Sequence, residues 1–223
     1  MRMRHKKRLD ERVSDANHYF LDNFCDQNAL IAAQNPVYAD FERIFGNKNP
    51  IVLEVGCGKG GFALKYATAN PAVNVVAVER LTNVVISGAE EAARQNLNNL
   101  KFIVTNAEYL PCFIKPHTVV KIILNFSCPY PKKSYRNRRL TNEKFLKIYK
   151  ELLTDDGELW QKTDNVDFFE YGLECFANEG WSITAKTYDL YAAAHDFNIP
   201  TEYETKFVAL GKPICFLIAK PPL

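Results

Sequence analysis

One stretch in the first third of the chain decides the fold, and it reads Ile51-Val52-Leu53-Glu54-Val55-Gly56-Cys57-Gly58-Lys59-Gly60-Gly61. Its first five residues include four apolar ones, and its last six include four glycines. A short apolar run that ends in glycines predicts a buried strand and a tight turn, because glycine tolerates positive φ. Residues 59–70 follow with helical character and stop at Asn70-Pro71, so the stretch predicts a strand, a turn and a helix.

The same alternation of strand and helix continues to the end of the chain. Further strands are predicted at 73–79, 101–105, 119–126, 158–162, 181–188 and 214–219, and further helices at 82–97, 139–153 and 166–178. The segment 119–126 is almost entirely apolar, which is typical of a central parallel strand covered on both faces. Repeated units of this kind predict a doubly wound α/β sheet with helices on both faces.

Length and composition favour one domain with an extension. The 223 residues are 47% hydrophobic and 13% aromatic, which excludes wholesale disorder. We expect a basic N-terminal arm with a short helix over residues 1–35, and the main domain over residues 36–223. No apolar run approaches the roughly 18 residues of a membrane span, and none follows the first charges as in a secretory signal. A cytoplasmic protein without membrane contact is therefore expected.

The cysteines and histidines predict neither a metal site nor disulfides. Six cysteines and four histidines are scattered, without any C-x-x-C pair. Free thiols in a reducing compartment are expected instead. The cysteines are Cys25, Cys57, Cys112, Cys128, Cys175 and Cys215.

Cations gather in the N-terminal arm. They could bind phosphates, or they could be the solvated residues of a frayed terminus, and the sequence leaves both interpretations open. The cations are Arg2, Arg4, Lys6, Lys7, Arg8 and Arg12.

The glycine turn is compatible with two cofactors. Gly56, Gly58 and Gly61 fit the G-x-G-x-x-G pattern of dinucleotide-binding oxidoreductases. Glu54, two residues before the first glycine, would repel a pyrophosphate but attract the amino group of a cationic sulfonium ligand. The turn therefore favours S-adenosylmethionine over a nicotinamide cofactor.

Two further polar residues follow predicted strands. Glu79 could accept hydrogen bonds from both hydroxyls of a ribose, or it could cap the next helix. Asn106 could accept from an adenine amino group, although asparagine is also ordinary in a turn after a strand.

A basic segment follows the fourth predicted strand and reads Asn125-Phe126-Ser127-Cys128-Pro129-Tyr130-Pro131-Lys132-Lys133-Ser134-Tyr135-Arg136-Asn137-Arg138-Arg139-Leu140-Thr141. Five cations and no acid lie between Lys132 and Arg139. Cations neutralise phosphates, and the interleaved tyrosine rings can stack on bases. A charge run is often only a solvated face, but this one begins at the carboxyl end of a central strand, where open α/β sheets bind ligands. The segment favours a nucleic-acid partner.

This segment resembles the N-F-S-D-P-W-P-K-K-x-x-x-x-R-R-L signature of the bacterial tRNA (guanine-N7-)-methyltransferases. The resemblance continues in several short motifs spread from the first residue to about Phe207. These are Met1-Arg2-Met3-Arg4, the turn from Leu53 to Gly60, Lys162-Thr163-Asp164-Asn165, Asn198-Ile199, Thr201-Glu202-Tyr203-Glu204 and Lys206-Phe207.

The resemblance implies a class I methyltransferase fold, which is Rossmann-like, with a seven-stranded mixed sheet whose last strand is antiparallel. It also implies transfer of a methyl group from S-adenosylmethionine to N7 of guanine 46 in the tRNA variable loop. The implied partner is tRNA, with no metal and no membrane, and the protein would act as a monomer or a homodimer.

The resemblance also assigns residues to the site. Asp164 and the residue at position 128 take the catalytic positions. The cofactor would be held by Glu54, Gly56, Gly58, Glu79, Asn106 and Cys128. The target nucleotide would face Lys132, Asp164, Thr201, Glu202, Tyr203 and Glu204. The RNA would be touched by Ser134, Tyr135, Arg136, Asn137, Arg138 and Arg139.

The chain departs from the signature at two positions. Cys128 stands where the family usually has aspartate, and Tyr130 stands where it usually has tryptophan. A thiol is a poor anionic acceptor unless nearby cations, such as Lys132 and Lys133, promote its ionisation. Because methylation of a nitrogen needs no covalent enzyme intermediate, we interpret Cys128 as a tolerated small residue and expect activity to be retained.

The chemistry predicts a guanine clamp. Guanine N7 carries a lone pair and no proton, so methyl transfer requires positioning rather than a general base. A carboxylate could accept from N1–H and the N2 amino group together, exclude adenine, and favour the forming cation. Asp164, Glu202 and Glu204 are the candidates. Asp164 could instead cap a helix, and the two glutamates could be solvent-facing strand or loop residues.

Three other functions stay open. The chain could be a catalytically silent tRNA-binding paralogue, a methyltransferase of the same fold acting on another RNA or a protein, or an oxidoreductase.

Overall fold

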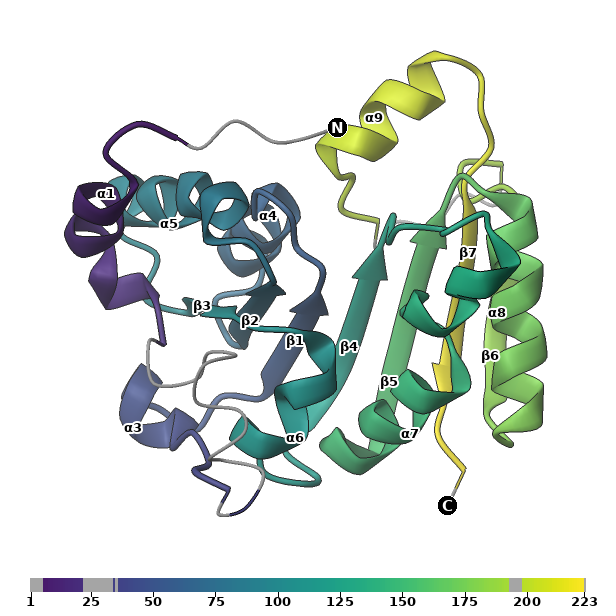
Figure 1. The fold of residues 1–223 in the computed structure, drawn as a ribbon, viewed down its shortest axis with the longest axis horizontal. Coiled ribbons are helices and arrows are strands. Elements are labelled where there is room, and N and C mark those ends of the chain that lie inside the picture. Colours follow the sequence, from purple (N-terminus) through teal and green to yellow (C-terminus); the bar gives the residue numbers. More distant parts are fainter. Residues whose placement is uncertain (1–5, 22–33, 35, 193–197, 223) are drawn as a thin grey trace.

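The computed structural model describes residues 6–21, 34, 36–192 and 198–222 and shows a single seven-stranded sheet (Figure 1). The strand order is β3-β2-β1-β4-β5-β7-β6. The strands are β1 (Ile51–Val55), β2 (Asn74–Glu79), β3 (Leu100–Val104), β4 (Val119–Asn125), β5 (Leu153–Thr163), β6 (Ser182–Thr187) and β7 (Cys215–Lys220). All seven predicted strands are confirmed; their ends shift by one residue at most, except that β5 begins at Leu153 rather than at 158.

The first five strands are parallel, and β7 runs antiparallel to both β5 and β6. The mixed sheet with an antiparallel last strand is thus confirmed. After β3 at one edge, the chain crosses back to place β4 on the other side of β1. This reversal of strand order is the place where open α/β sheets bind ligands, outside the carboxyl ends of the strands.

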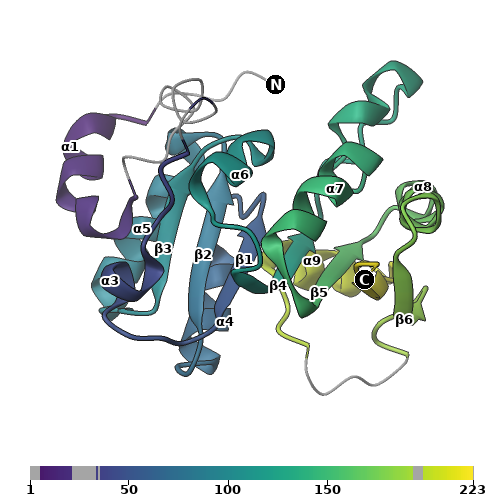
Figure 2. The ribbon, with the colours of Figure 1, turned by 90° about the horizontal axis from the view of Figure 1, so that it is seen from below.

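Helices cover both faces of the sheet (Figure 2). One face is covered by α1 (Leu9–Asp15), α4 (Gly61–Ala69) and α5 (Thr82–Gln95), whose apolar residues pack on β2 and β3. The other is covered by α3 (Phe41–Phe45), α6 (Leu110–Phe113), α7 (Glu143–Leu152) and α8 (Val166–Asn178). Short 3-10 turns lie at η1 (Asn17–Tyr19), η2 (Ala107–Tyr109) and η3 (Lys133–Arg138), and α9 (Glu202–Ala209) precedes β7.

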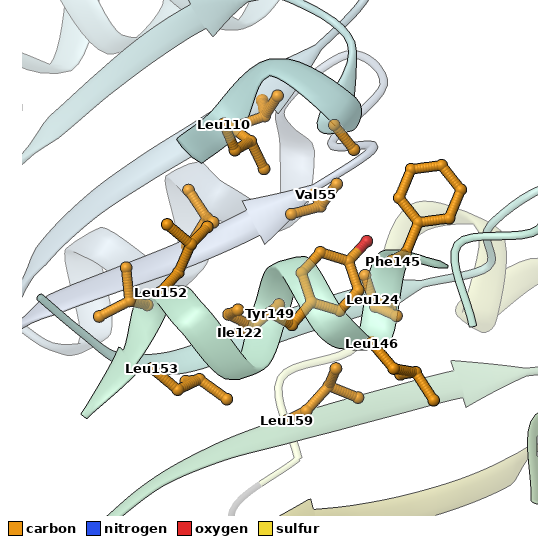
Figure 3. Packing of buried hydrophobic residues seen from close by; sticks show 14 of the residues in the cluster. Val55, Leu110, Ile122, Leu124, Phe145, Leu146, Tyr149, Leu152, Leu153 and Leu159 are labelled. Carbon is orange, nitrogen blue, oxygen red and sulfur yellow. The ribbon is translucent and has the colours of Figure 1, made fainter. Parts of the chain in front are cut away.

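Helix α7 shows how the apolar pattern becomes core. Its residues Phe145, Leu146, Tyr149 and Leu152 share one face and point toward β1, β4 and β5 (Figure 3). The helix begins at Glu143 rather than at 139, because the side chain of Asn142 accepts the backbone N–H of Lys144 and caps it.

The N-terminal segment belongs partly to the packed body. Tyr19 and Phe20 are buried against the α5 face, and the backbone N–H of Leu21 donates to the carbonyl of Phe102 in β3. Arg12 pairs with Glu90 of α5 at 2.6 Å. Residues Met1 to Arg4, with Arg2 and Arg4, and Cys25 lie outside the described residues. So do 22–33 and 35, and the boundary predicted after residue 35 stays a prediction.

Two features are absent from the residues that the structure describes. No helix there is both long and apolar enough for a membrane span. No group of three or more His, Cys, Asp or Glu residues lies there in an arrangement that could hold a metal ion.

Candidate functional site

A cavity of about 490 Å³ opens at the carboxyl ends of β1 to β4, and its volume suits a ligand of nucleoside size. Its floor is the ends of β1 and β2, and its walls are the turns that follow β3 and β4. Arg138, Leu140 and Phe145 close one side. The cavity therefore lies at the strand-order reversal.

The glycine turn shapes the floor of the cavity. Gly56 and Gly58 have φ of +80° and +58°, a region that other residues adopt only with strain. A Cβ at Gly58 would have no heavy atom within 4 Å, so ligand atoms can approach this backbone closely. The N–H groups of Gly56 and Cys57 both donate to the carbonyl of Val78 and tie the turn to β2.

Glu79 lines the cavity and is held by backbone donors. One carboxylate oxygen accepts from Gly58 N–H at 3.2 Å, and the other accepts from Leu81 N–H at 3.1 Å. Each oxygen keeps a lone pair, so the carboxylate can also accept from two ribose hydroxyls. The alternative role as cap of α5 is not what the structure shows, because the cap residue is Leu81 and no side chain caps that helix. Asn106 lines the cavity beyond Glu79.

Glu54 is placed differently from the expectation. It is 2% exposed and is not among the cavity-lining residues in the described part of the chain. Val55 faces the cavity side, so the preceding side chain points to the opposite face of the sheet. Burial raises the pKa of Glu54 to about 7, against the lowering effects of Asn125, Lys162 and the N–H of Ala63.

Hydrogen-bond acceptors that could bind an ammonium group lie at the carboxyl ends of β1 and β4. Asn125 donates to one oxygen of Glu54 at 3.0 Å. The other Glu54 oxygen, the Asn125 carbonyl oxygen and the Ser127 hydroxyl are buried and have no partner among the described residues. A ligand with both N–H donors and ribose hydroxyls fits these acceptors together with Glu79.

The turn after β4 is strained and brings Ser127 and Cys128 to the cavity. Phe126 and Tyr130 have φ of +49° and +39°, which is uncommon for bulky residues. Strain of this kind persists where surrounding contacts impose it, often at functional sites. Here Phe126 N–H donates to the carbonyl of Lys162 at 2.8 Å. Cys128 is exposed within the cavity wall.

The basic segment forms η3 beside the cavity. Residues 132–138 are all exposed, and the Arg138 guanidinium lies 4.5 Å from the Tyr135 ring centroid. Arg139 differs, because it is 6% exposed, donates to the Tyr130 carbonyl at 3.2 Å, and lies over the Tyr171 ring. The expected RNA contact of Arg139 is therefore corrected: this guanidinium holds the turn from inside.

Asp164 directly follows the end of β5, the strand that pairs with β4. Asn165, not Asp164, caps α8, since its side chain accepts from Phe168 N–H at 2.8 Å, so the helix-cap interpretation of Asp164 is wrong. Asp164 is partly exposed, and no hydrogen bond or ion pair engages its carboxylate within the described residues. Burial raises the pKa of Tyr203, and the nearby Asp164 charge raises it further.

Residues 201–204 start α9 rather than forming a strand or loop. Thr201 and Glu204 make a reciprocal capping box. Glu202 is exposed, and its carboxylate lies at the start of α4, 3.5 Å from the position of a Cβ at Gly61. Tyr203 is 50% exposed, and its ring centroid lies 5.3 Å from that of Phe126.

Glu204 faces inward, unlike Glu202. It is 0% exposed and pairs with Lys162, so it is not the solvent-facing residue that one interpretation expected. Asp164 is partly exposed and Glu202 and Tyr203 are exposed, but none of the three is among the residues that line the cavity; Lys132 is exposed on the basic segment. The sequence analysis assigned no role to Lys162 or Asn125. The signal that could have identified them is that each is a polar residue near the end of an apolar strand.

Comparisons with known proteins identify the family of this chain. A family model described as "Putative methyltransferase" matches residues 48–217. The tRNA (guanine-N(7)-)-methyltransferase of Bacillus subtilis (strain 168) is 39% identical over 218 residues, which cover 96% of each chain.

Solved structures share the fold. The 16S rRNA methyltransferase KamB superposes with a TM-score of 0.62 at 18% identity, over 83% of this chain and 95% of that chain. A geranyl diphosphate methyltransferase in complex with GPP and sinefungin gives 0.54 at 15% identity, over 86% of this chain and 76% of that chain. The structural likeness shows a methyltransferase fold, and the sequence likeness narrows it: this chain belongs to the tRNA (guanine-N(7)-)-methyltransferase family.

Proposed function

We propose that this protein transfers a methyl group from S-adenosylmethionine to N7 of a guanine in tRNA, and that the guanine is number 46 of the variable loop. The observation that carries the proposal is one of placement. A nucleoside-sized cavity is lined by Glu79 and by Arg138 of η3, and the other cations of η3 are exposed beside it. The family relationship supports the same reaction.

Different residues of the chain bind different parts of the cofactor. Glu79 accepts the ribose hydroxyls of the cofactor, Asn106 accepts from its adenine, and Gly56 and Gly58 let it lie close to the backbone. The Ser127 hydroxyl, which lines the cavity and has no partner among the described residues, accepts from the amino group, whereas Glu54 stays enclosed beneath the turn. When bound, S-adenosylmethionine supplies an electrophilic methyl group on a cationic sulfur.

The remaining task is to hold guanine. Asp164 and Glu202 accept from the N1–H and N2 amino edge and leave N7 directed at the methyl group, while their charge favours the cationic product. No general base is required, because N7 carries no proton. Lys132 and the exposed residues Ser134 to Arg138 contact the RNA backbone.

Cys128 does not abolish this reaction, because it lines the cavity but supplies no bond that the transfer requires. We expect methyl incorporation into unmodified tRNA by the wild type, at least equal incorporation by Cys128→Asp, and a loss of about 10²-fold for Asp164→Ala. Asp156→Ala, an exposed carboxylate at the amino end of β5, is the matched control and keeps wild-type turnover.

Three outcomes would contradict parts of the proposal. A wild type that is silent while Cys128→Asp is active contradicts retained activity and favours the tRNA-binding paralogue. Normal turnover by Asp164→Ala contradicts the assignment of Asp164 to the guanine clamp. Mass analysis of nuclease fragments that places the methyl group on another nucleotide removes the assignment to guanine 46.

A further inference from the structure

A buried ion pair lies behind the site. Lys162 Nζ, at the end of β5, lies 2.7 Å from a carboxylate oxygen of Glu204 in the first turn of α9, and their side chains are 5% and 0% exposed. The other ion pairs of the described residues are more exposed. Burying two charges is costly unless both are fully partnered, so the partners of this pair decide what it does.

Both charges are saturated by the chain itself. The Lys162 ammonium donates to Glu204, to the Asn198 side-chain oxygen at 2.9 Å and to the Ile199 carbonyl at 3.0 Å. These contacts use its three N–H groups.

The Glu204 carboxylate is equally full. One oxygen accepts from Lys162 and from Thr201 N–H at 3.2 Å, and the other accepts from Asn198 at 2.7 Å and Tyr191 OH at 3.0 Å. Four donors occupy the roughly four acceptor directions of a carboxylate. With no exposed surface and no free lone pair, Glu204 has nothing to offer a guanine edge.

The pair instead joins α9 to the sheet. Helix α9 stands at the carboxyl edge of the sheet, above β4 and β5 (Figure 1). Its first turn carries Glu202, beside Gly61 at the start of α4, and Tyr203, against Phe126 in the strained β4 turn. A shift of this turn would therefore move both Glu202 and Tyr203 relative to α4 and the β4 turn.

We propose that the Lys162–Glu204 pair sets the position of α9, and that Glu204 is a positioning residue that acts through Lys162 rather than a residue that contacts the target base. The consequence for methyl transfer rests on the proposed function. The consequence for the order of α9 does not, and the two can be measured separately.

The test compares Lys162→Met, Glu204→Gln and the double variant. Hydrogen exchange of residues 199–209 is expected to accelerate in both single variants, because each leaves a buried charge without its partner. For tRNA methylation we expect kcat to fall about 10²-fold in each single variant, with less change in KM for tRNA. The double variant loses no more than the worse single variant, because the two residues act as a unit.

Two controls separate positioning from general damage. Lys121→Met removes a partly buried lysine of β4 that pairs with Glu158 of β5 at 3.2 Å, and it leaves exchange of α9 unchanged. Affinity for S-adenosylhomocysteine stays within about twofold in every variant, as the cavity floor is untouched. If Lys162→Met does not fold, Lys162→Gln replaces it, with a smaller acceleration of α9 exchange expected.

The results that overturn the proposal are specific. Wild-type exchange of α9 in Lys162→Met shows that the pair does not position the helix. A Glu204→Gln variant with reduced turnover, beside a Lys162→Met variant with normal turnover and normal α9 exchange, shows that Glu204 contacts the substrate. A wild-type protein that does not methylate tRNA refutes the proposed function, while the exchange data still decide the role of the pair.

Discussion

At the scale of single residues, Glu54 and Glu79 show how neighbours set the role of a carboxylate. Both stand at or near the end of apolar strands. Glu79 lies at the cavity with two backbone donors, whereas Glu54 is enclosed beneath the turn, where one oxygen accepts from Asn125 and the other has no partner among the described residues. Burial raises the pKa of Glu54 to about 7, from an ordinary value of 4.5. Glu54 thus charges within the neutral range.

This pKa predicts how stability depends on pH. Between about 4.5 and 7 the folded protein holds a proton on Glu54 that the unfolded chain releases. The free energy of unfolding that this proton contributes is therefore fully present at low pH, and it is lost as pH rises through 7. Glu54→Gln removes this dependence, so above pH 7 it is expected to be more stable than the wild type by about 3 kcal/mol, with little difference near pH 4. Urea unfolding across this range tests it, and parallel curves for the two proteins would show that Glu54 does not titrate there.

At the scale of elements, close contact between α5 and the glycine turn positions the cavity floor. A Cβ at Gly88 of α5 would lie 2.6 Å from the carbonyl oxygen of Lys59 and 3.3 Å from Cα of Gly60. Gly60 has φ of +77°, and its own Cβ would lie 2.9 Å from the Phe102 ring. The helix, the turn and β3 are thus packed without room for a side chain between them.

We expect Gly88→Ala to displace the turn. Alanine favours a helix over glycine by up to about 1 kcal/mol, but contact with a backbone atom that cannot rotate away costs about 1–3 kcal/mol. The net result is lower thermal stability and weaker binding of S-adenosylhomocysteine, by about tenfold. Calorimetric titration and thermal unfolding measure both. Unchanged affinity together with raised stability would mean that the glycine turn can move away from the new methyl group without a loss of free energy.

The start of helix α9 is marked in the sequence by a local pattern. Its start follows the Thr-x-x-Glu capping-box pattern at Thr201 and Glu204, after Pro200, and that local signal was sufficient to predict a helix there. The resemblance, by contrast, treats residues 201–204 as one substrate-binding unit. The helix divides the unit, because successive residues of a helix point in different directions.

At the scale of the whole molecule, charge distribution matters more than the net charge of +2. Of the four described N-terminal cations, Arg8 and Arg12 pair with Glu11 and Glu90, Lys6 donates to Ser87, and Lys7 is exposed. The cations of residues 132–138 are exposed beside the cavity mouth, with no acid among them. The electrostatic footprint for a polyanion therefore lies on η3, next to the proposed site of methyl transfer.

This distribution predicts the salt dependence of tRNA binding. Affinity is expected to fall steeply with salt, and Arg138→Ala should reduce the slope of log K against log [salt] by about 1, because one phosphate contact is lost. Arg94→Ala is the matched control, since Arg94 pairs with Glu91 near the last turn of α5, at the amino-terminal edge of the sheet. Equal slopes for Arg138→Ala and wild type would place the RNA elsewhere on the surface.

Much of the fold and part of the site could be predicted from the sequence. The order of strands and helices followed from apolar periodicity, and the glycine turn followed from its composition. Both are local properties that neighbouring residues determine. The placement of Glu79 and Asn106 at the cavity followed as well, because residues after parallel strands meet at one edge of the sheet.

Local patterns in the chain were sufficient for the order of strands and helices and for the motifs that reveal the family. Which polar residues of those motifs face inward depended on tertiary packing. Glu204 meets Lys162 from 42 residues away, and Asn125 meets Glu54 from 71 residues away. The physical reason is that burial and pairing arise between segments brought together by the sheet, and a local pattern carries no information about such partners.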